Sequence, residues 1–135
     1  MIETVFTLLV VFQIKHWLCD YPLQSQFMLK KFQREGWVLP LTYHAGVHAI
    51  FTSVICAVFL GDHYTQVVDW LLVSAPLLLG LLDFTIHFIV DRVKAHPDLG
   101  GRYKIDNPKF WWSLGADQSV HHLTHYLIIY IMVGL

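Results

Sequence analysis

Residues 41–60 read LTYHAGVHAIFTSVICAVFL, a run of helical length that contains no Asp, Glu, Lys or Arg. About 20 helical residues are enough to cross roughly 30 Å of hydrocarbon. Pro40 precedes this run and Gly61 follows it, as expected at the two ends of a helix. The run therefore predicts a transmembrane helix. It also carries His44 and His48, whose spacing of four places both side chains on one helix face.

Three other apolar stretches reach the same length: 2–20, which Pro22 follows, 67–94, and 113–135. The first lacks a basic start and a small-residue cleavage site, so we expect it to be retained as a helix. Only 14% of the chain is charged, whereas soluble domains carry about 25%. The prediction is an all-α integral membrane bundle of four transmembrane helices, forming a single domain over 1–135. A barrel is excluded because the spans have helical length.

Basic residues are unevenly distributed among the connections. The first, FMLKKFQREGW at 27–37, is basic and amphipathic, so we expect a short interfacial helix after the first span. The third connection is also basic, whereas GDHYTQ at 61–66 has no Lys or Arg. The positive-inside rule then predicts a multi-pass protein of the bacterial inner membrane with both termini in the periplasm. Lys15 is expected to extend to the cytoplasmic interface.

Each predicted span carries His or Asp residues at a spacing of four, which gives it a polar stripe. The first and third spans run toward the cytoplasm and have their stripes at their C-terminal ends. The second and fourth run away from it and have their stripes at their N-terminal ends. All four stripes therefore reach one level, inside the cytoplasmic leaflet. The residues expected to meet there are His16, Asp20, His44, His48, His87, Asp91, Asp117 and His121.

Ionisable residues within a membrane are costly, which favours a functional site over chance. Imidazole together with carboxylate is typical of transition-metal sites. We therefore predict that these eight residues bind a divalent transition metal, zinc first, with manganese, iron and nickel as alternatives. The other interpretation is that the histidines only hydrogen-bond between helices. His63 and His96 fall in predicted loops and are expected to be solvated.

Four segments, HWLCDYPLQ, HAGVHAI, HFIVDRVK and DQSVHHLTHY, resemble in order the motifs of the domain of unknown function 3307 family. That family comprises small bacterial and phage membrane proteins with HxxxDFxxQ, HxxxH, HxxxDxxK and DQxxH patterns. The resemblance covers essentially the whole chain, with Tyr21 where Phe is usual. It implies a helical membrane bundle but no activity. The positions it marks are His16, Asp20, Gln24, His44, His48, His87, Asp91, Lys94, Asp117, Gln118 and His121.

The leading functional hypothesis is a metal-dependent membrane hydrolase that acts on a lipid or amphiphile. Asp91 or Asp117 would be the general base, and Lys94 or Arg92 would hold a phosphate or carboxylate headgroup. The expected partners are membrane lipids, with a second copy or a host membrane protein as further possibilities. With a net charge of −1, nucleic acid is not expected as a partner.

Two other functions stay open. In the first, the chain is a non-enzymatic bacterial or phage membrane regulator or binding protein whose His/Asp cluster, with or without metal, is structural. The second is transport of an ion along the stripes. Transport is disfavoured because residues 49–59 and 128–135 contain almost no ionisable group.

Overall fold

The computed structural model describes residues 2–63 and 69–135, without the side chains of residues 63 and 69–72. Within that part all regular structure is helical, which confirms the all-α class, whereas the four transmembrane spans stay a prediction. The four long helices are α1 (Ile2–Asp20), α2 (Val38–His63), α3 (Asp69–Ala95) and α4 (Pro108–Gly134), and the two short 3₁₀ helices are η1 (Met28–Phe32) and η2 (Gly100–Arg102).

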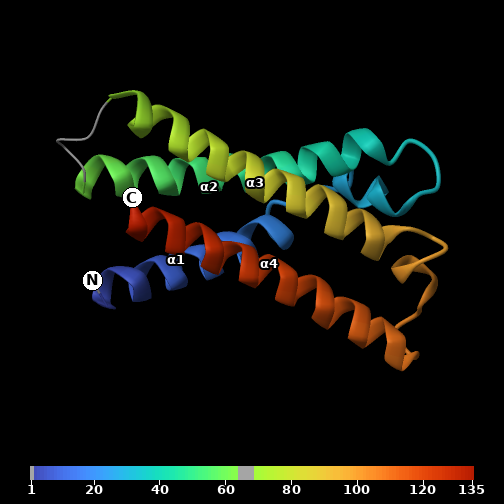
Figure 1. Ribbon diagram of the computed structural model, residues 1–135. Coiled ribbons are helices and arrows are strands. Elements are labelled where there is room, and N and C mark those ends of the chain that lie inside the picture. The colour runs from blue at the N-terminus through green and yellow to red at the C-terminus, as the bar shows by residue number, and fades with distance from the viewer. Residues whose placement is uncertain (1, 64–68) are drawn as a thin grey trace.

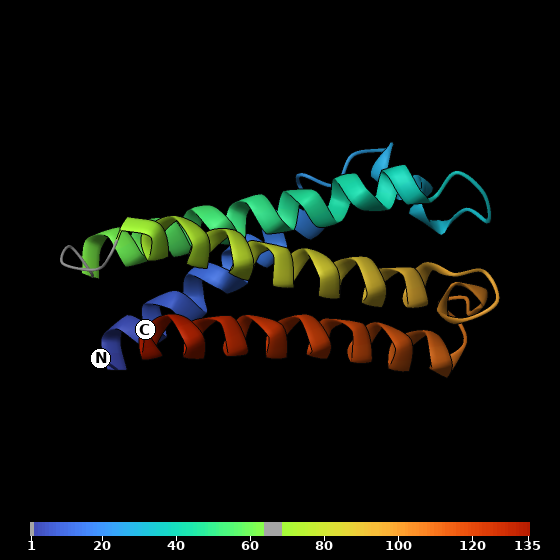
Figure 2. The same ribbon diagram turned by 45° about the horizontal axis from the view of Figure 1, so that its top comes forward.

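The four long helices lie lengthwise beside one another, and both chain termini lie at the same end of the bundle (Figures 1 and 2). The connections 21–37 and 96–107 lie at the opposite end, which we call the connection end. α2 packs against α1 and α3, and α4 packs against the same two helices. The α2–α3 contact is close because Gly80 lies against Ser53, and a Cβ at Gly80 would be 2.9 Å from the backbone oxygen of Ala49.

The helix ends follow local chemistry. α1 ends at Asp20, two residues before Pro22, because a residue that precedes proline avoids the helical conformation. α4 begins at Pro108, where Asn107 accepts a hydrogen bond from the Lys109 N–H at 2.9 Å. Proline suits the first helical turn, where the missing N–H has no partner anyway.

The structure reproduces the first predicted span and extends the others. α1 has the predicted bounds, whereas α2 begins three residues before 41 and α4 five residues before 113. η1 lies in the segment expected to contain a short helix. Residues 64–68, which include the predicted start of the third span and part of the second connection, lie outside the described residues.

Three of the helical segments are long and apolar enough to cross a membrane: Ile2–Asp20, Val38–Asp62 and Val73–Arg102. α4 has 27 residues, but the segment predicted as the fourth span does not reach the same hydropathy. The reason is its polar face, which includes Asp117, His121 and His125. Over its described residues the chain is therefore helical and has three membrane-span-like segments.

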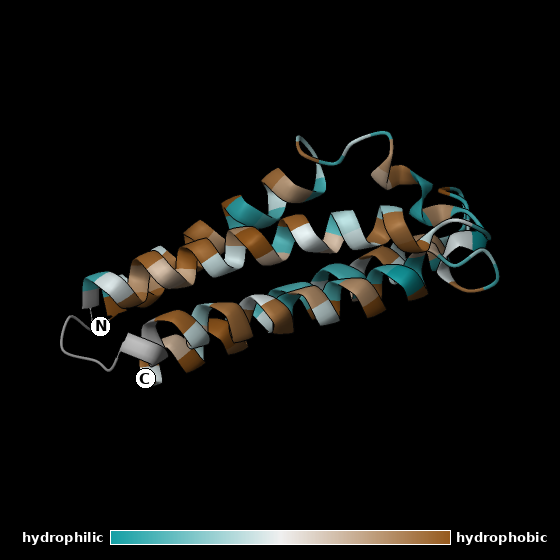
Figure 3. Cartoon of the chain, turned by 90° about the horizontal axis from the view of Figure 1, so that it is seen from above, coloured by the Kyte–Doolittle hydropathy of each residue, from teal (hydrophilic) through white to brown (hydrophobic). Residues whose placement is uncertain are grey.

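Polar and apolar residues are distributed inversely to a water-soluble bundle. Large apolar side chains face outward, among them Phe6 at 66% exposure and Leu78 at 63%. The interior has two halves. The half near the termini is an apolar core, and the half near the connection end buries Lys, His and Asp (Figure 3). Such a surface suits lipid as the solvent. The apolar core consists of Leu8, Phe12, Cys56, Phe59, Leu60, Ala75, Leu79, Ile128, Ile129 and Met132.

Candidate metal centre

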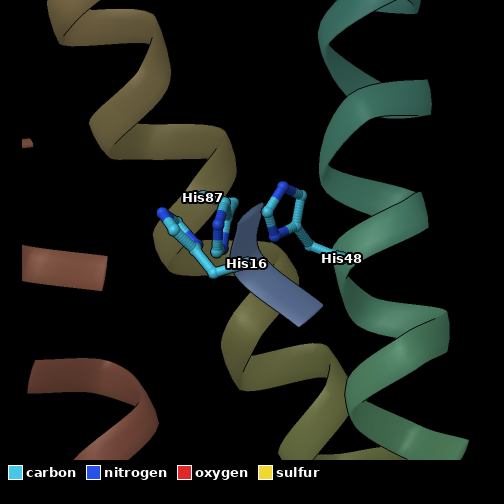
Figure 4. Close-up of side chains that lie close together, drawn as sticks. All are labelled: His16, His48 and His87. Atoms are coloured by element: carbon cyan, nitrogen blue, oxygen red, sulfur yellow. The ribbon is translucent and has the colours of Figure 1, made fainter. Parts of the chain in front are cut away.

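All four long helices contribute to one polar cluster in the interior. It contains the eight predicted residues, and their potential ligand atoms form three groups, each within 4.8 Å. Seven of the eight are buried, and the Asp20 side chain retains 16% exposure. Figure 4 shows His16, His48 and His87 pointing toward one another from α1, α2 and α3. The groups are His16 with His48 and His87, Asp20 with His44 and His48, and Asp91 with Asp117 and His121.

Asp20 is surrounded by imidazole nitrogens. Its Oδ1 lies 3.1 Å from His48 Nε2 and 3.5 Å from His44 Nε2. Its Oδ2 lies 3.2 Å from His16 Nε2. Two ligands of a tetrahedral zinc ion, with bonds of about 2.0–2.1 Å, are separated by about 3.3 Å. The atoms around Asp20 thus have the spacing of ligands that share one ion.

Asp91 faces two histidines with its two oxygens. Oδ2 lies 3.0 Å from His44 Nε2, and Oδ1 lies 3.2 Å from His121 Nε2. His121 Nε2 is also 3.4 Å from Asp117 Oδ1. Asp91 therefore joins the Asp20 group to the Asp117 group.

Several buried atoms of the cluster lack a hydrogen-bond partner within the described part of the chain. Both ring nitrogens of His44 are in this position, as are His87 Nε2 and Asp117 Oδ1. His44 Nε2 is close to Asp91 but without hydrogen-bond geometry. An unsatisfied buried polar atom costs about 1–3 kcal/mol. A bound cation satisfies lone pairs that point at no donor, so the donor set fits a metal.

Stacked imidazole rings hold the cluster in place. The ring centroids of His48 and His87 are 3.8 Å apart, and those of His87 and His121 are 3.9 Å apart. This stack of three rings crosses from α2 through α3 to α4, with His16 against its side at 5.4–5.8 Å. The rings cannot turn independently, so the nitrogens are presented in fixed directions.

A cavity of about 330 Å³ adjoins the cluster at the connection end. Asp20, Asp91 and Gln118 belong to both the cluster and the cavity wall. Lys31 and Lys94 also line it, and each ammonium donates to a cluster carboxylate at 2.7 Å, Lys31 to Asp91 and Lys94 to Asp117. The cluster is thus accessible from one side, beside two cations.

Arg92, the predicted alternative to Lys94, is directed elsewhere. Its guanidinium lies 3.9 Å from the Trp37 ring centroid and donates to the backbone oxygens of Lys31 and Gln33 at 3.3 Å. It is not among the residues that line the cavity. Arg92 therefore anchors the first connection.

The expectation that Lys15 extends to the interface is wrong. Its side chain is 2% exposed, and Nζ donates to Asp83 Oδ2 at 2.6 Å. The Thr52 hydroxyl donates to the same oxygen at 2.6 Å. Lys15 Nζ also lies 3.3 Å from His48 Nδ1. An ammonium buried in an apolar span needs a carboxylate at its own depth, and Asp83 meets that need.

Asp83 also positions His87. Its backbone oxygen and its Oδ1 both lie 3.1 Å from His87 Nδ1, and the hydrogen bond of this nitrogen is to the backbone oxygen. A backbone carbonyl or a carboxylate at one ring nitrogen fixes the ring and its tautomer in metal sites and leaves the other nitrogen for the ion. The eight residues predicted to meet did not include Lys15 or Asp83. The sequence pattern that could have added Asp83 is its position one helical turn before His87, on the same helix face.

Of the two histidines predicted to lie in loops, His96 can be placed, and it lies outside the cluster. His96 directly follows α3, is half-buried, and accepts a hydrogen bond from the Asp98 N–H at 3.1 Å. His63 is the last residue of α2, not a loop residue, and its side chain lies outside the described part.

Fold and site together define a helical protein with membrane-span-like segments and buried His/Asp groups that could hold metal. Comparisons with models of known families, with curated proteins and with solved structures each found no match. The resemblance to the domain of unknown function 3307 family stays a prediction.

Proposed function

We propose that this chain is a four-span membrane protein that binds a divalent transition metal at the cytoplasmic leaflet and hydrolyses a lipid or other amphiphile. The observation that carries the proposal is a buried His/Asp cluster that opens into a cavity beside two lysines. A purely structural cluster needs no such opening. A hydrolase needs it for water and substrate.

The donor set is suited to metal-assisted hydrolysis. Asp20, His44 and His48 would hold the ion, with Asp91, Asp117 and His121 adjacent. A bound zinc ion polarises the scissile group and lowers the pKa of its water to about 7. Manganese, iron and nickel also accept imidazole and carboxylate.

The remaining tasks belong to side chains in the cavity wall or directly behind it. Asp117 lies behind the wall, where it accepts a hydrogen bond from Lys94, and its Oδ1 has no hydrogen-bond partner in the described chain and can accept a proton. Lys94 retains 27% exposure of its side chain and can donate to an anionic headgroup. Asp91 is the other carboxylate placed to act as a base. Apolar residues complete the wall, among them Phe32 and Phe110.

Metal content and its link to hydrolysis test this function. Detergent-purified full-length protein should contain at least one transition-metal ion per chain by elemental analysis. Chelation should remove the ion and stop the release of product from fluorescent phospholipids and carboxylic esters, and added Zn²⁺ should restore it. Protein that contains no transition metal and takes up none would refute the proposal.

Topology is a separate prediction. Both termini should lie in the periplasm, because the connection end carries the Lys and Arg residues of the first and third connections. A C-terminal alkaline phosphatase fusion should be active, and a C-terminal green fluorescent protein fusion should be dark. The reverse pattern would place the cavity on the other side of the membrane.

The second candidate is a non-enzymatic binding protein or regulator, in contact with a second copy or a host membrane protein. It is favoured by the ion pairs of Lys31 with Asp91 and of Lys94 with Asp117, which neutralise two carboxylates without metal. The coordination shell separates the candidates. A closed shell of four protein ligands indicates structure, and an open position with bound water indicates catalysis.

A further inference from the structure

The cluster has more carboxylates than ammonium groups, and a bound divalent cation would change the sign of its net charge. Asp83, Asp91 and Asp117 each pair with one lysine, at 2.6, 2.7 and 2.7 Å, and Asp20 pairs with none among the described residues. With neutral histidines the cluster thus has one carboxylate more than it has ammonium groups. One divalent ion would make it cationic, and two would make it strongly so. Excess positive charge in a low-dielectric interior is costly. An anion in the cavity would therefore stabilise the metal-loaded cluster.

Asp91 indicates how many ions the cluster takes. Its Oδ2 belongs with His44 and the Asp20 group, and its Oδ1 belongs with His121 and Asp117. A single carboxylate that faces two donor groups in this way can bridge two ions, and here its Oδ2 also accepts a hydrogen bond from Lys31 at 2.7 Å. Two-ion sites hold their ions about 3.5–4 Å apart and are typical of phosphatases and nucleases.

We infer that the cluster binds two divalent cations bridged by Asp91, and that the anion in the adjoining cavity is a phosphate ester of an amphiphile. The inference rests on the proposed function and names its substrate class. A phosphate ester carries up to two negative charges that can balance the excess positive charge of the metal-loaded cluster, whereas a carboxylate carries one. Lysine is a regular phosphate ligand, and Lys94 lines the cavity.

The cavity wall also matches an amphiphile. Lys31, Lys94 and the carboxylates form its polar part, and Leu29, Phe32, Phe110 and Leu114 are apolar. A phosphate group therefore fits beside the cluster, and an acyl or prenyl tail would lie against the apolar residues of the wall. In the hydrolysis, water adds to phosphorus, and the bond between phosphorus and the alcohol oxygen breaks. The proton that water loses ends on that oxygen, so no co-reactant is needed.

Metal stoichiometry tests the two-ion site. Full-length protein in detergent, loaded with Mn²⁺, should bind two ions per chain. Its electron paramagnetic resonance spectrum should be that of an exchange-coupled pair, a result that needs no mutation. Asp117→Asn should reduce the stoichiometry to one ion and abolish the coupling, because it removes a ligand of the His121 group together with the counter-ion of Lys94. His96→Ala, outside the cluster, should keep both ions. One uncoupled ion in the wild type would overturn the inference and leave the proposed function standing, whereas no ion would end both.

Anion binding tests the ligand. Calorimetry should show inorganic phosphate binding to the Zn²⁺-loaded protein and not to the chelated protein. Dihexanoyl phosphatidic acid, below its micelle concentration, should bind at least about tenfold more tightly, because its tails bury apolar surface. Equal affinity would assign the site to free phosphate and overturn the amphiphile. Lys94→Met should weaken both ligands and Lys94→Arg should restore them. Tighter binding of decanoate, or cleavage of carboxylic esters alone, would overturn the phosphate assignment while the proposed hydrolase stands.

Discussion

Asp83→Asn should lower the free energy of unfolding by about 3–5 kcal/mol, the usual cost of removing one partner from a buried ion pair. Lys15 is 2% exposed and donates to Asp83 at 2.6 Å, so the substitution leaves an ammonium without its counter-ion inside the bundle. Asn retains an acceptor for the Thr52 hydroxyl, which restricts the change to charge. Denaturant unfolding in detergent, followed by circular dichroism, measures the effect.

A double variant separates charge from packing. Lys15→Met combined with Asp83→Asn removes both charges and should recover most of the lost stability, because Met fills a similar volume. The matched control is the surface pair of Arg34 and Asp98, whose side chains are 66% and 57% exposed. Arg34→Gln should leave stability unchanged, since exposed ion pairs contribute little. If the double variant were no more stable than Asp83→Asn, the ion pair would not account for the loss.

His48→Ala should abolish metal binding and reduce thermal stability in the metal-loaded protein. His48 belongs to two of the three ligand groups, and its Nε2 lies 3.1 Å from Asp20. Loss of a residue that hydrogen-bonds to a metal ligand already lowers metal affinity about 10–100-fold. Loss of a direct ligand should lower it further. Elemental analysis and melting temperature, each with and without Zn²⁺, measure both effects.

His96→Ala is the control for His48→Ala, because it removes an imidazole from the same protein outside the cluster. It should change neither metal content nor melting temperature. If His48→Ala kept its metal and its Zn²⁺-dependent stability, the histidines of this cluster would only hydrogen-bond between helices. That outcome would favour the structural interpretation.

The polar cluster was predictable because helical spacing and depth are both readable from sequence. His44 and His48 share a face by their spacing alone, and the alternation of span direction brings their level to that of His87 and Asp91. All eight predicted residues lie in the three ligand groups as a result. The bounds of α1 were predictable too, because Pro22 follows a largely apolar run of helical length.

Lys15 was not predictable by the same reasoning. A lysine near the end of a span can extend to water or turn inward, and sequence does not indicate which. The outcome depends on whether Asp83 of α3 reaches the same depth, which is a property of packing. The start of α4 was placed too late, at 113, whereas Asn107 and Pro108 together begin the helix five residues earlier.

The stack of His48, His87 and His121 also has a mechanical consequence for the protein in its bilayer. The His48 ring is tilted by 31° against the His87 ring, and the His87 and His121 rings are stacked at 13°. These contacts across α2, α3 and α4 fix the axial register of the three helices. Helices locked in this way cannot shorten or lengthen the bundle by sliding. In a membrane thinner or thicker than its apolar belt, the protein must respond by tilting as one body or by deforming the lipid around it.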